Sequence, residues 1–168
     1  MYCNRIEPVG TIALACMGIM LSLTVLSWAD QSQTGRQMMV HKMGANVMPF
    51  DLSKTLHIFE MTDHGGIQQV IIRDPKDKDQ LPMIRQHLQY EAMRFREGNF
   101  TDPISLHGKN MPGIKELSAN ASKIKIDYGD LPNGAQLTFE TNDLHLITAI
   151  HRWFGAQLSD HGADATYK

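Results

Sequence analysis

The chain has 168 residues, of which 42% are hydrophobic and 20% charged, and its formal net charge at pH 7 is −2. This length can bury a core in one domain, and the weakly negative charge argues against a general nucleic-acid-binding protein, which needs a basic face. The two cysteines, Cys3 and Cys16, both lie in the N-terminal apolar segment. The remainder of the chain must therefore fold without a disulfide bond.

The N-terminal segment resembles a secretory signal. Arg5 precedes an apolar run from Val9 to Trp28, and "SWAD" places small residues at Ser27 and Ala29. This pattern predicts a signal peptide over residues 1–29 with cleavage after Ala29, and hence a periplasmic or secreted protein. The alternative is an uncleaved anchor, because the run approaches the length needed to span a membrane. No later apolar run is long enough to do so.

Residues 30–54 are expected to form a flexible or packing arm in front of a single domain over residues 55–168. The arm contains "MMVHKM", with Met38, Met39, His41 and Met43 close together. Thioether and imidazole groups are ligands that copper favours, so His41 is a weak candidate metal ligand. The alternative is that this segment is an apolar lead-in to the fold.

The first half of the domain has a ββα pattern. "TLHIFEMT" and "IQQVIIRD" are β-rich runs separated by "DHGG", which indicates a hairpin. A helix follows, with aspartates available as N-caps and Gly98 as a plausible stop. Its predicted apolar stripe is formed by Leu81, Ile84, Leu88, Ala92 and Phe95.

The second half repeats the pattern. "SKIKIDY" and "AQLTFET" flank the turn "GDLPNG", and "ND" caps a helix. Its predicted apolar stripe is Leu144, Ile147, His151, Phe154 and Leu158. The order ββα, connector, ββα predicts an α+β fold: a four-stranded antiparallel sheet with two helices on one face and an approximate internal two-fold.

The connector, residues 99–122, is expected to be irregular except for one short helix from about Gly113 to Ala119. Its "LHGKNMPG" stretch contains two glycines and a proline, which favour a fixed loop that presents His107 and Met111. Long irregular segments within a compact domain are often functional.

Four residues form the main candidate metal site: His107, Met111, His151 and His161. His151 lies on the predicted core stripe, where a hydrogen-bonded structural role is the alternative. His161 follows the helix, where capping is the alternative. Ten helical residues span about 15 Å, so His151 and His161 cannot share one ion on a straight helix. His87, on the flank of the first helix, is a weaker candidate. We expect His151 and the His107 loop to meet in one pocket.

Catalytic motifs give little support for an enzyme. The chain after the N-terminal segment contains no cysteine, no G-x-S-x-G and no glycine-rich phosphate loop. Ser105, Asp102 and His107 are close in sequence, but this does not establish the geometry of a catalytic triad. No catalytic residue is therefore proposed from the sequence.

The stretches "LHGKNMPG", "AIHRWFGAQLSDHGADA", "MGANVMPFDLSKTLHIF" and "GGIQQVIIRDPKD" resemble those of a group of short exported bacterial proteins. The likeness covers about residues 40–165 and implies export, but no particular activity. Members often carry the automated name aspartate carbamoyltransferase. Such transferases have two α/β domains and a Ser-Thr-Arg-Thr phosphate motif, which this sequence lacks.

Three functions therefore stand in order of preference. The first is an exported binding protein for a metal ion, copper above all, held by histidine and methionine. The second is a non-enzymatic module that meets another protein of the cell envelope. The third is a small hydrolase or transferase.

Overall fold

The computed structural model describes the backbone of residues 17–168 and the side chains of residues 31–168. Residues 33–168 form one compact unit, and the chain up to Ser32 forms a second unit. The signal expected over residues 1–29 thus lies partly outside the described residues, together with Cys3 and Cys16. Of that segment the structure describes only the backbone from Met17 onward, which is helical.

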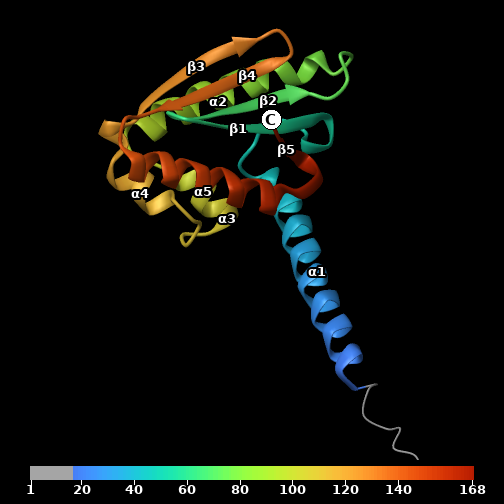
Figure 1. Cartoon of the computed structure of the whole chain (residues 1–168). Coiled ribbons are helices and arrows are strands. Elements are labelled where there is room, and N and C mark those ends of the chain that lie inside the picture. Colours follow the sequence, from blue (N-terminus) through green and yellow to red (C-terminus); the bar gives the residue numbers. More distant parts are fainter. Residues whose placement is uncertain (1–16) are drawn as a thin grey trace, which may run out of the picture. The chain divides into compact units, whose positions relative to one another are not determined.

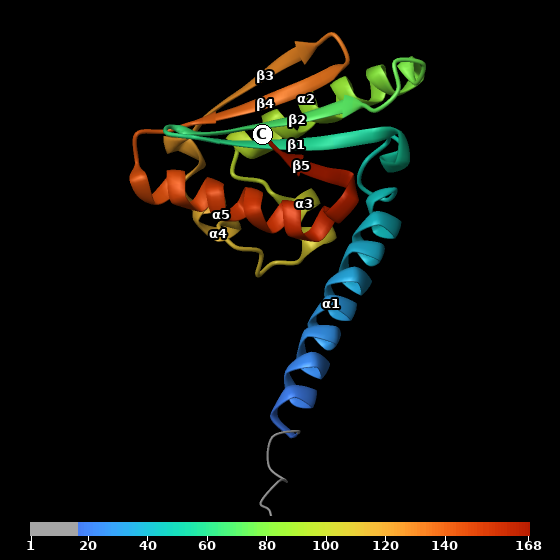
Figure 2. The same cartoon turned by 45° about the vertical axis from the view of Figure 1, so that its right-hand side comes forward.

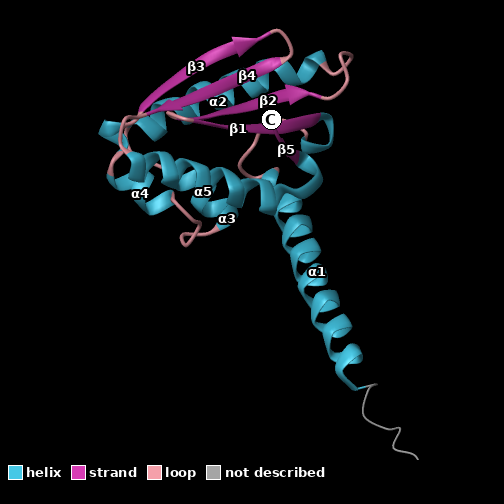
Figure 3. Ribbon diagram, in the orientation of Figure 1, coloured by secondary structure: helices cyan, strands magenta, loops and turns pink. Residues whose placement is uncertain are grey.

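The described residues form helices and strands in a mixed order (Figures 1 and 3). The α-helices are α1 Met17–Gly44, α2 Leu81–Arg96, α3 Thr101–His107, α4 Ile114–Ala119 and α5 Leu144–His161. The strands are β1 Thr55–Thr62, β2 Gly65–Ile72, β3 Lys125–Leu131, β4 Gly134–Glu140 and β5 Ala165–Tyr167. The 3₁₀ turns are Leu52–Lys54, Lys78–Gln80, Ala121–Lys123 and Gly162–Asp164. The α+β class is confirmed.

The sheet differs from the expected one by an additional strand. The strands of the described chain are ordered β3-β4-β2-β1-β5, and the two hairpins pair antiparallel through β2 and β4. β5 pairs parallel with β1, with His57 opposite Ala165. The prediction of a four-stranded, purely antiparallel sheet is therefore wrong. β5 has no counterpart beside β3, so the internal two-fold is not matched either.

One face of the sheet carries the core, and helices α2 and α5 both pack on it. Phe95 of α2 and Phe154 of α5 each contact Phe139 of β4, with ring centroids 6.2 and 5.7 Å apart. Trp153 of α5 is fully buried among these rings. Figure 2 shows α5 running beneath the strands with α3 and α4 beside it. The prediction of two helices on one face is confirmed.

The segment expected as an arm is helical as far as Gly44 and then turns toward the sheet. Its apolar side chains Val40, Met48, Phe50 and Leu52 are buried in the core, whereas Met38, Met39 and Met43 are exposed. Within residues 17–168, no helix is both long enough and apolar enough to cross a membrane.

The connector contains more helix than expected. α4 lies where the sequence predicts it, but residues 101–107 form α3 instead of a loop, and His107 is the last residue of that helix. Proline in a first helical turn disturbs no hydrogen bond, because that N–H has no intrahelical partner. Pro103 is therefore compatible with α3. The predicted capping of α2 by aspartate is absent, since Gln80 occupies that position.

α5 is rotated relative to the predicted stripe. Leu144, placed inward by the prediction, is 76% exposed. The buried face comprises Leu146, Ile147, Ala149, Ile150, Trp153, Phe154, Gln157 and His161. His161 thus occupies the core face of the helix, while His151 is on its flank.

Candidate functional site

The expected pairing of His151 with the His107 loop does not occur. His151 Nε2 lies 3.0 Å from the Thr62 carbonyl oxygen and 2.8 Å from the Gly65 carbonyl oxygen, at the turn of the β1–β2 hairpin. Because both partners are acceptors, Nε2 carries the proton and donates to them. His151 therefore ties α5 to the hairpin.

His107 instead meets His161, and His161 meets a histidine that the sequence analysis did not select. The His161 ring stacks on His57 of β1, with centroids 4.8 Å apart. It also contacts His107 edge to face, with centroids 4.9 Å apart. All three imidazoles are buried. Three elements distant in sequence, β1, α3 and α5, therefore bring these rings together.

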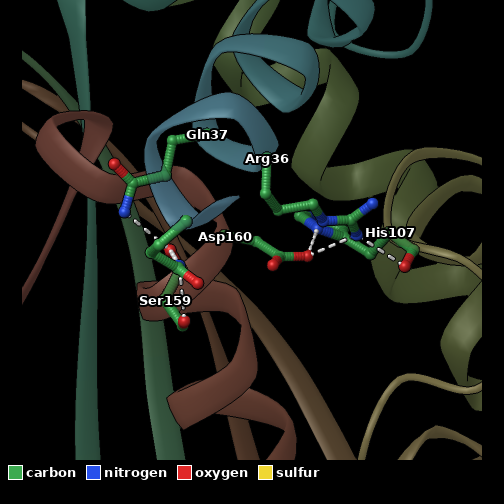
Figure 4. A network of polar contacts seen from close by, with 6 residues as sticks. Arg36, Gln37, His107, Ser159 and Asp160 are labelled. Carbon is green, nitrogen blue, oxygen red and sulfur yellow. Dashed lines mark hydrogen bonds and ion pairs between the residues drawn. The ribbon is translucent and has the colours of Figure 1, made fainter. Parts of the chain in front are cut away.

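A carboxylate orients His107 (Figure 4). Asp160 Oδ2 lies 2.9 Å from His107 Nδ1 and 2.6 Å from the guanidinium of Arg36 in α1. Arg36 also donates to the His107 carbonyl oxygen, at 2.7 Å. Burial alone would raise the pKa of Asp160, but these hydrogen bonds outweigh it and hold that pKa below its usual value. The ionised carboxylate fixes the proton of His107 on Nδ1, so Nε2 keeps its lone pair.

The three rings line a small cavity of about 40 Å³, whose wall also includes His87. We call it the histidine cavity, defined by His57, His87, His107 and His161. It has room for an ion or for water-sized groups, but not for an extended organic molecule. Its wall is formed by β1, β2, β4 and helices α2, α3 and α5, together with Val47 and Met48.

Unpartnered polar atoms gather around this cavity. Five buried side-chain atoms among the described residues have no hydrogen-bond partner within the protein. They are His57 Nδ1, Gln68 Oε1, Glu91 Oε1, Trp153 Nε1 and His161 Nδ1. All five residues line the histidine cavity. A buried polar atom left unpaired costs about 1–3 kcal/mol. A polar group or an ion inside the cavity that paired with these atoms would therefore be favoured.

The imidazoles of the cavity are neutral at physiological pH. Burial lowers the pKa of His57 to about 3 and that of His87 to about 4. Burial likewise lowers the pKa of His107, and that of His161 well below its usual value. The Asp164 backbone hydrogen-bonds His57. His57 Nδ1 has no hydrogen-bond partner.

Two carboxyl groups form another part of the wall: Glu91 of α2 and Asp102 of α3. Glu91 is 5% exposed. Burial, reinforced by the neighbouring Asp102, raises the pKa of Glu91 to about 8. Asp102 is paired with Arg94 at 3.3 Å. Glu91 therefore holds its proton at neutral pH.

The remaining candidates lie apart from the three rings. Met111 is buried, but it lines a surface groove of about 640 Å³ that it shares with His107, Arg36 and Asp160. His41 is exposed and pairs with Asp164 at 2.5 Å. Across the part of the chain that the structure describes, no three His, Cys, Asp or Glu side chains are already arranged around one metal position.

The comparisons with known proteins identify no relative. No protein-family model, no curated protein and no solved structure matches this chain. The resemblance to short exported proteins therefore stays an expectation from the sequence motifs. The site has to be interpreted from its own chemistry.

Proposed function

We propose that the protein is an exported binding protein whose histidine cavity takes up a single soft metal ion, Cu(I). The main support is the convergence of His57, His107 and His161 on a small cavity lined by every unpartnered buried side-chain atom of the described residues. Metal ions bind the neutral form of imidazole, which is the form these rings hold.

The second layer of contacts favours a metal over a general polar ligand. Histidines that bind metals commonly donate their other ring N–H to a carboxylate or a backbone carbonyl. His107 does so to Asp160, which leaves its other ring nitrogen with a lone pair to offer an ion. His57 has an unpartnered Nδ1 in the same cavity.

Cu(I) suits the cavity better than Zn(II). A zinc site takes four ligands, which are chiefly cysteine, histidine and carboxylate side chains. Cu(I) accepts fewer ligands and also binds thioethers, and Met48 lines the same cavity. No preformed three-ligand set is present among the described side chains, so binding requires the imidazole rings to rotate toward the ion.

Ag(I) is the probe for the first test, because it shares the charge and closed d shell of Cu(I) and is not oxidised in air. The exported protein, residues 30–168, which lacks Cys3 and Cys16, is titrated with silver nitrate in chloride-free buffer and followed by calorimetry. We expect one tight site, weakened at least 100-fold by His107→Gln or His161→Gln. The matched control is His145→Gln, an exposed histidine near the start of α5.

The variants must first be shown to unfold cooperatively, so that lost binding is not lost structure. A parent protein that binds no Ag(I) contradicts the proposal. In that case the second candidate leads, a module that docks on an envelope protein. Exposed Met38, Met39 and Met43 on α1 would then be the first surface to map.

Export is part of the proposal and has its own test. Cleavage after Ala29 would leave a mature chain that begins at Asp30, within α1. The intact mass of the protein recovered from the periplasm should match residues 30–168. A retained N-terminus would show that the segment is an anchor.

A further inference from the structure

Glu91 has no role in the ligand set proposed above, yet it faces the same cavity. Its side chain projects from α2, is 5% exposed, and leaves Oε1 without a partner. A buried ionised carboxylate needs a nearby positive charge or several hydrogen bonds. The cation nearest to Glu91 is Arg94, which already pairs with Asp102, and the side-chain hydrogen bond of Glu91 goes to that second carboxyl group, so burial favours the protonated acid.

The groups that face Glu91 explain why it keeps its proton. Asp102 of α3 adds negative charge, and its positive partner Arg94 is shared with Tyr90 Oη at 2.8 Å and Asn99 Oδ1 at 3.0 Å. The cavity's four imidazoles are uncharged. Adding a cation to this cavity introduces a further positive charge, which would stabilise an ionised Glu91.

We infer that the binding of a monovalent cation in the histidine cavity displaces the proton of Glu91. The exchange is balanced: the protonated protein and one cation give the cation complex and one released proton. The net charge of the cavity is therefore the same before and after binding, because the negative charge of the ionised Glu91 compensates the positive charge of the ion. This inference rests on the proposed function and concerns its regulation by pH.

Substitution identifies the source of the proton. A carboxyl group at position 91 can release a proton when a cation enters the cavity, whereas an amide in the same place cannot.

The experiment measures protons released on binding Ag(I) to the exported protein, residues 30–168, which has no thiol, by calorimetry in buffers of different ionisation enthalpy. At about pH 7 we expect close to one proton per ion, falling toward zero above about pH 9, where Glu91 is already ionised. Below about pH 7 the apparent affinity should fall about tenfold per pH unit.

Glu91→Gln is the test variant, because an amide resembles a protonated carboxyl in size and hydrogen bonding. It should bind Ag(I) with almost no proton release and with an affinity independent of pH between about pH 6 and 8. Glu116→Gln, at an exposed residue of α4 paired with Arg152, is the matched control and should release protons like the parent.

The outcomes separate this inference from the function on which it rests. Binding without proton release in the parent, or unchanged release in Glu91→Gln, overturns the exchange and leaves the metal site standing. Absence of Ag(I) binding in the folded parent overturns the metal site and the exchange with it.

Discussion

Asp160 connects the histidine cavity to α1, since it accepts hydrogen bonds from both His107 and Arg36. Asp160→Asn removes the negative charge of the carboxylate, and the tautomer of His107 is then no longer fixed. Changes in such supporting contacts typically reduce metal affinity roughly 10–100-fold. We expect a loss of Ag(I) affinity in this range, measured by competitive titration.

Asp164→Asn provides the control for this change. Asp164 also pairs with a histidine, His41, but that ring is exposed and outside the cavity. The substitution leaves the backbone carbonyl of residue 164 in place, so His57 keeps its partner. If both variants lost the same Ag(I) affinity, Asp160 would act only through its negative charge and not through its hydrogen bond to His107.

His151 has a structural role, because its Nε2–H satisfies the carbonyl groups of Thr62 and Gly65. His151→Ala leaves both carbonyls without this donor and should lower the free energy of unfolding by about 1–3 kcal/mol. Ag(I) affinity should be unchanged. Urea unfolding and the same titration measure the two effects, and a loss of binding with unchanged stability would contradict this role.

His57 shows why part of the site could not be found from the sequence. In β1 the buried positions are Thr55, His57 and Phe59, while Leu56 and Ile58 lie on the other, half-buried face. Apolar residues thus occur on both faces, so period-two alternation does not indicate that His57 points inward. His107 and His161 are candidates from the sequence, and the structure brings them together with His57, whose contact is non-local.

The register of α5 was ambiguous for a similar reason. Residues 144–158 include apolar side chains around most of the helix, so two stripes one or two positions apart fit the pattern almost equally. Packing of Trp153 against Phe95 and Phe139 selects the observed one. This rotation moves His161 into the core and His151 to the flank.

Two of the elements that escaped prediction are short. α3 has seven residues and β5 has three, too few for periodicity to be recognised. β5 exists because it pairs with β1 across the sheet edge, a contact more than one hundred residues away in sequence. The helix over residues 30–44, the end of α1, was also missed, because that segment was expected to be a flexible arm. The two hairpins and helices α2 and α5 have clear patterns and were predicted in the right order and type.

Gly113 fixes the start of α4 against α5 and offers a test at this scale. Its φ is +81°, and a Cβ there would lie 2.1 Å from the Ala149 carbonyl oxygen. Gly113→Ala should therefore lower the free energy of unfolding by about 2–4 kcal/mol, as measured by urea denaturation.

Gly35→Ala is the matched control, since a Cβ at this α1 position meets no atom within 4 Å. Alanine is the better helix former, so this variant should be neutral or more stable by up to about 1 kcal/mol. If Gly113→Ala also proved neutral, the close approach of α4 to α5 would be wrong.

The stability of the whole molecule should depend on pH in both directions. The pKa values of His57 and His87 lie near 3 and 4 in the folded protein, against 6.5 for an ordinary histidine. Their contribution is complete above about pH 6.5 and is lost as the pH falls toward 3. Glu91, with its pKa raised to about 8, contributes below about pH 4.5 and loses that contribution as the pH rises to 8.

We therefore expect maximum stability near about pH 6.5, measured as the urea midpoint across the pH range. Stability should fall more steeply toward acid than toward alkaline pH, because several histidines contribute to the acid limb and one carboxyl group, Glu91, contributes to the alkaline limb. Glu91→Gln should remove the decline between about pH 6.5 and 8 and leave the acid limb intact. A parent whose stability rises steadily from neutral to alkaline pH would contradict the buried, protonated Glu91.

The central claim is that three imidazoles from β1, α3 and α5 bind one ion. Its most direct test is the ¹⁵N NMR spectrum of the histidine rings of the exported protein, residues 30–168, recorded as Ag(I) is added to one equivalent. The account predicts large shifts of one ring nitrogen each in His57, His107 and His161, with His145 and His151 unchanged. Shifts confined to exposed histidines such as His41, or no shift in any ring, would contradict it.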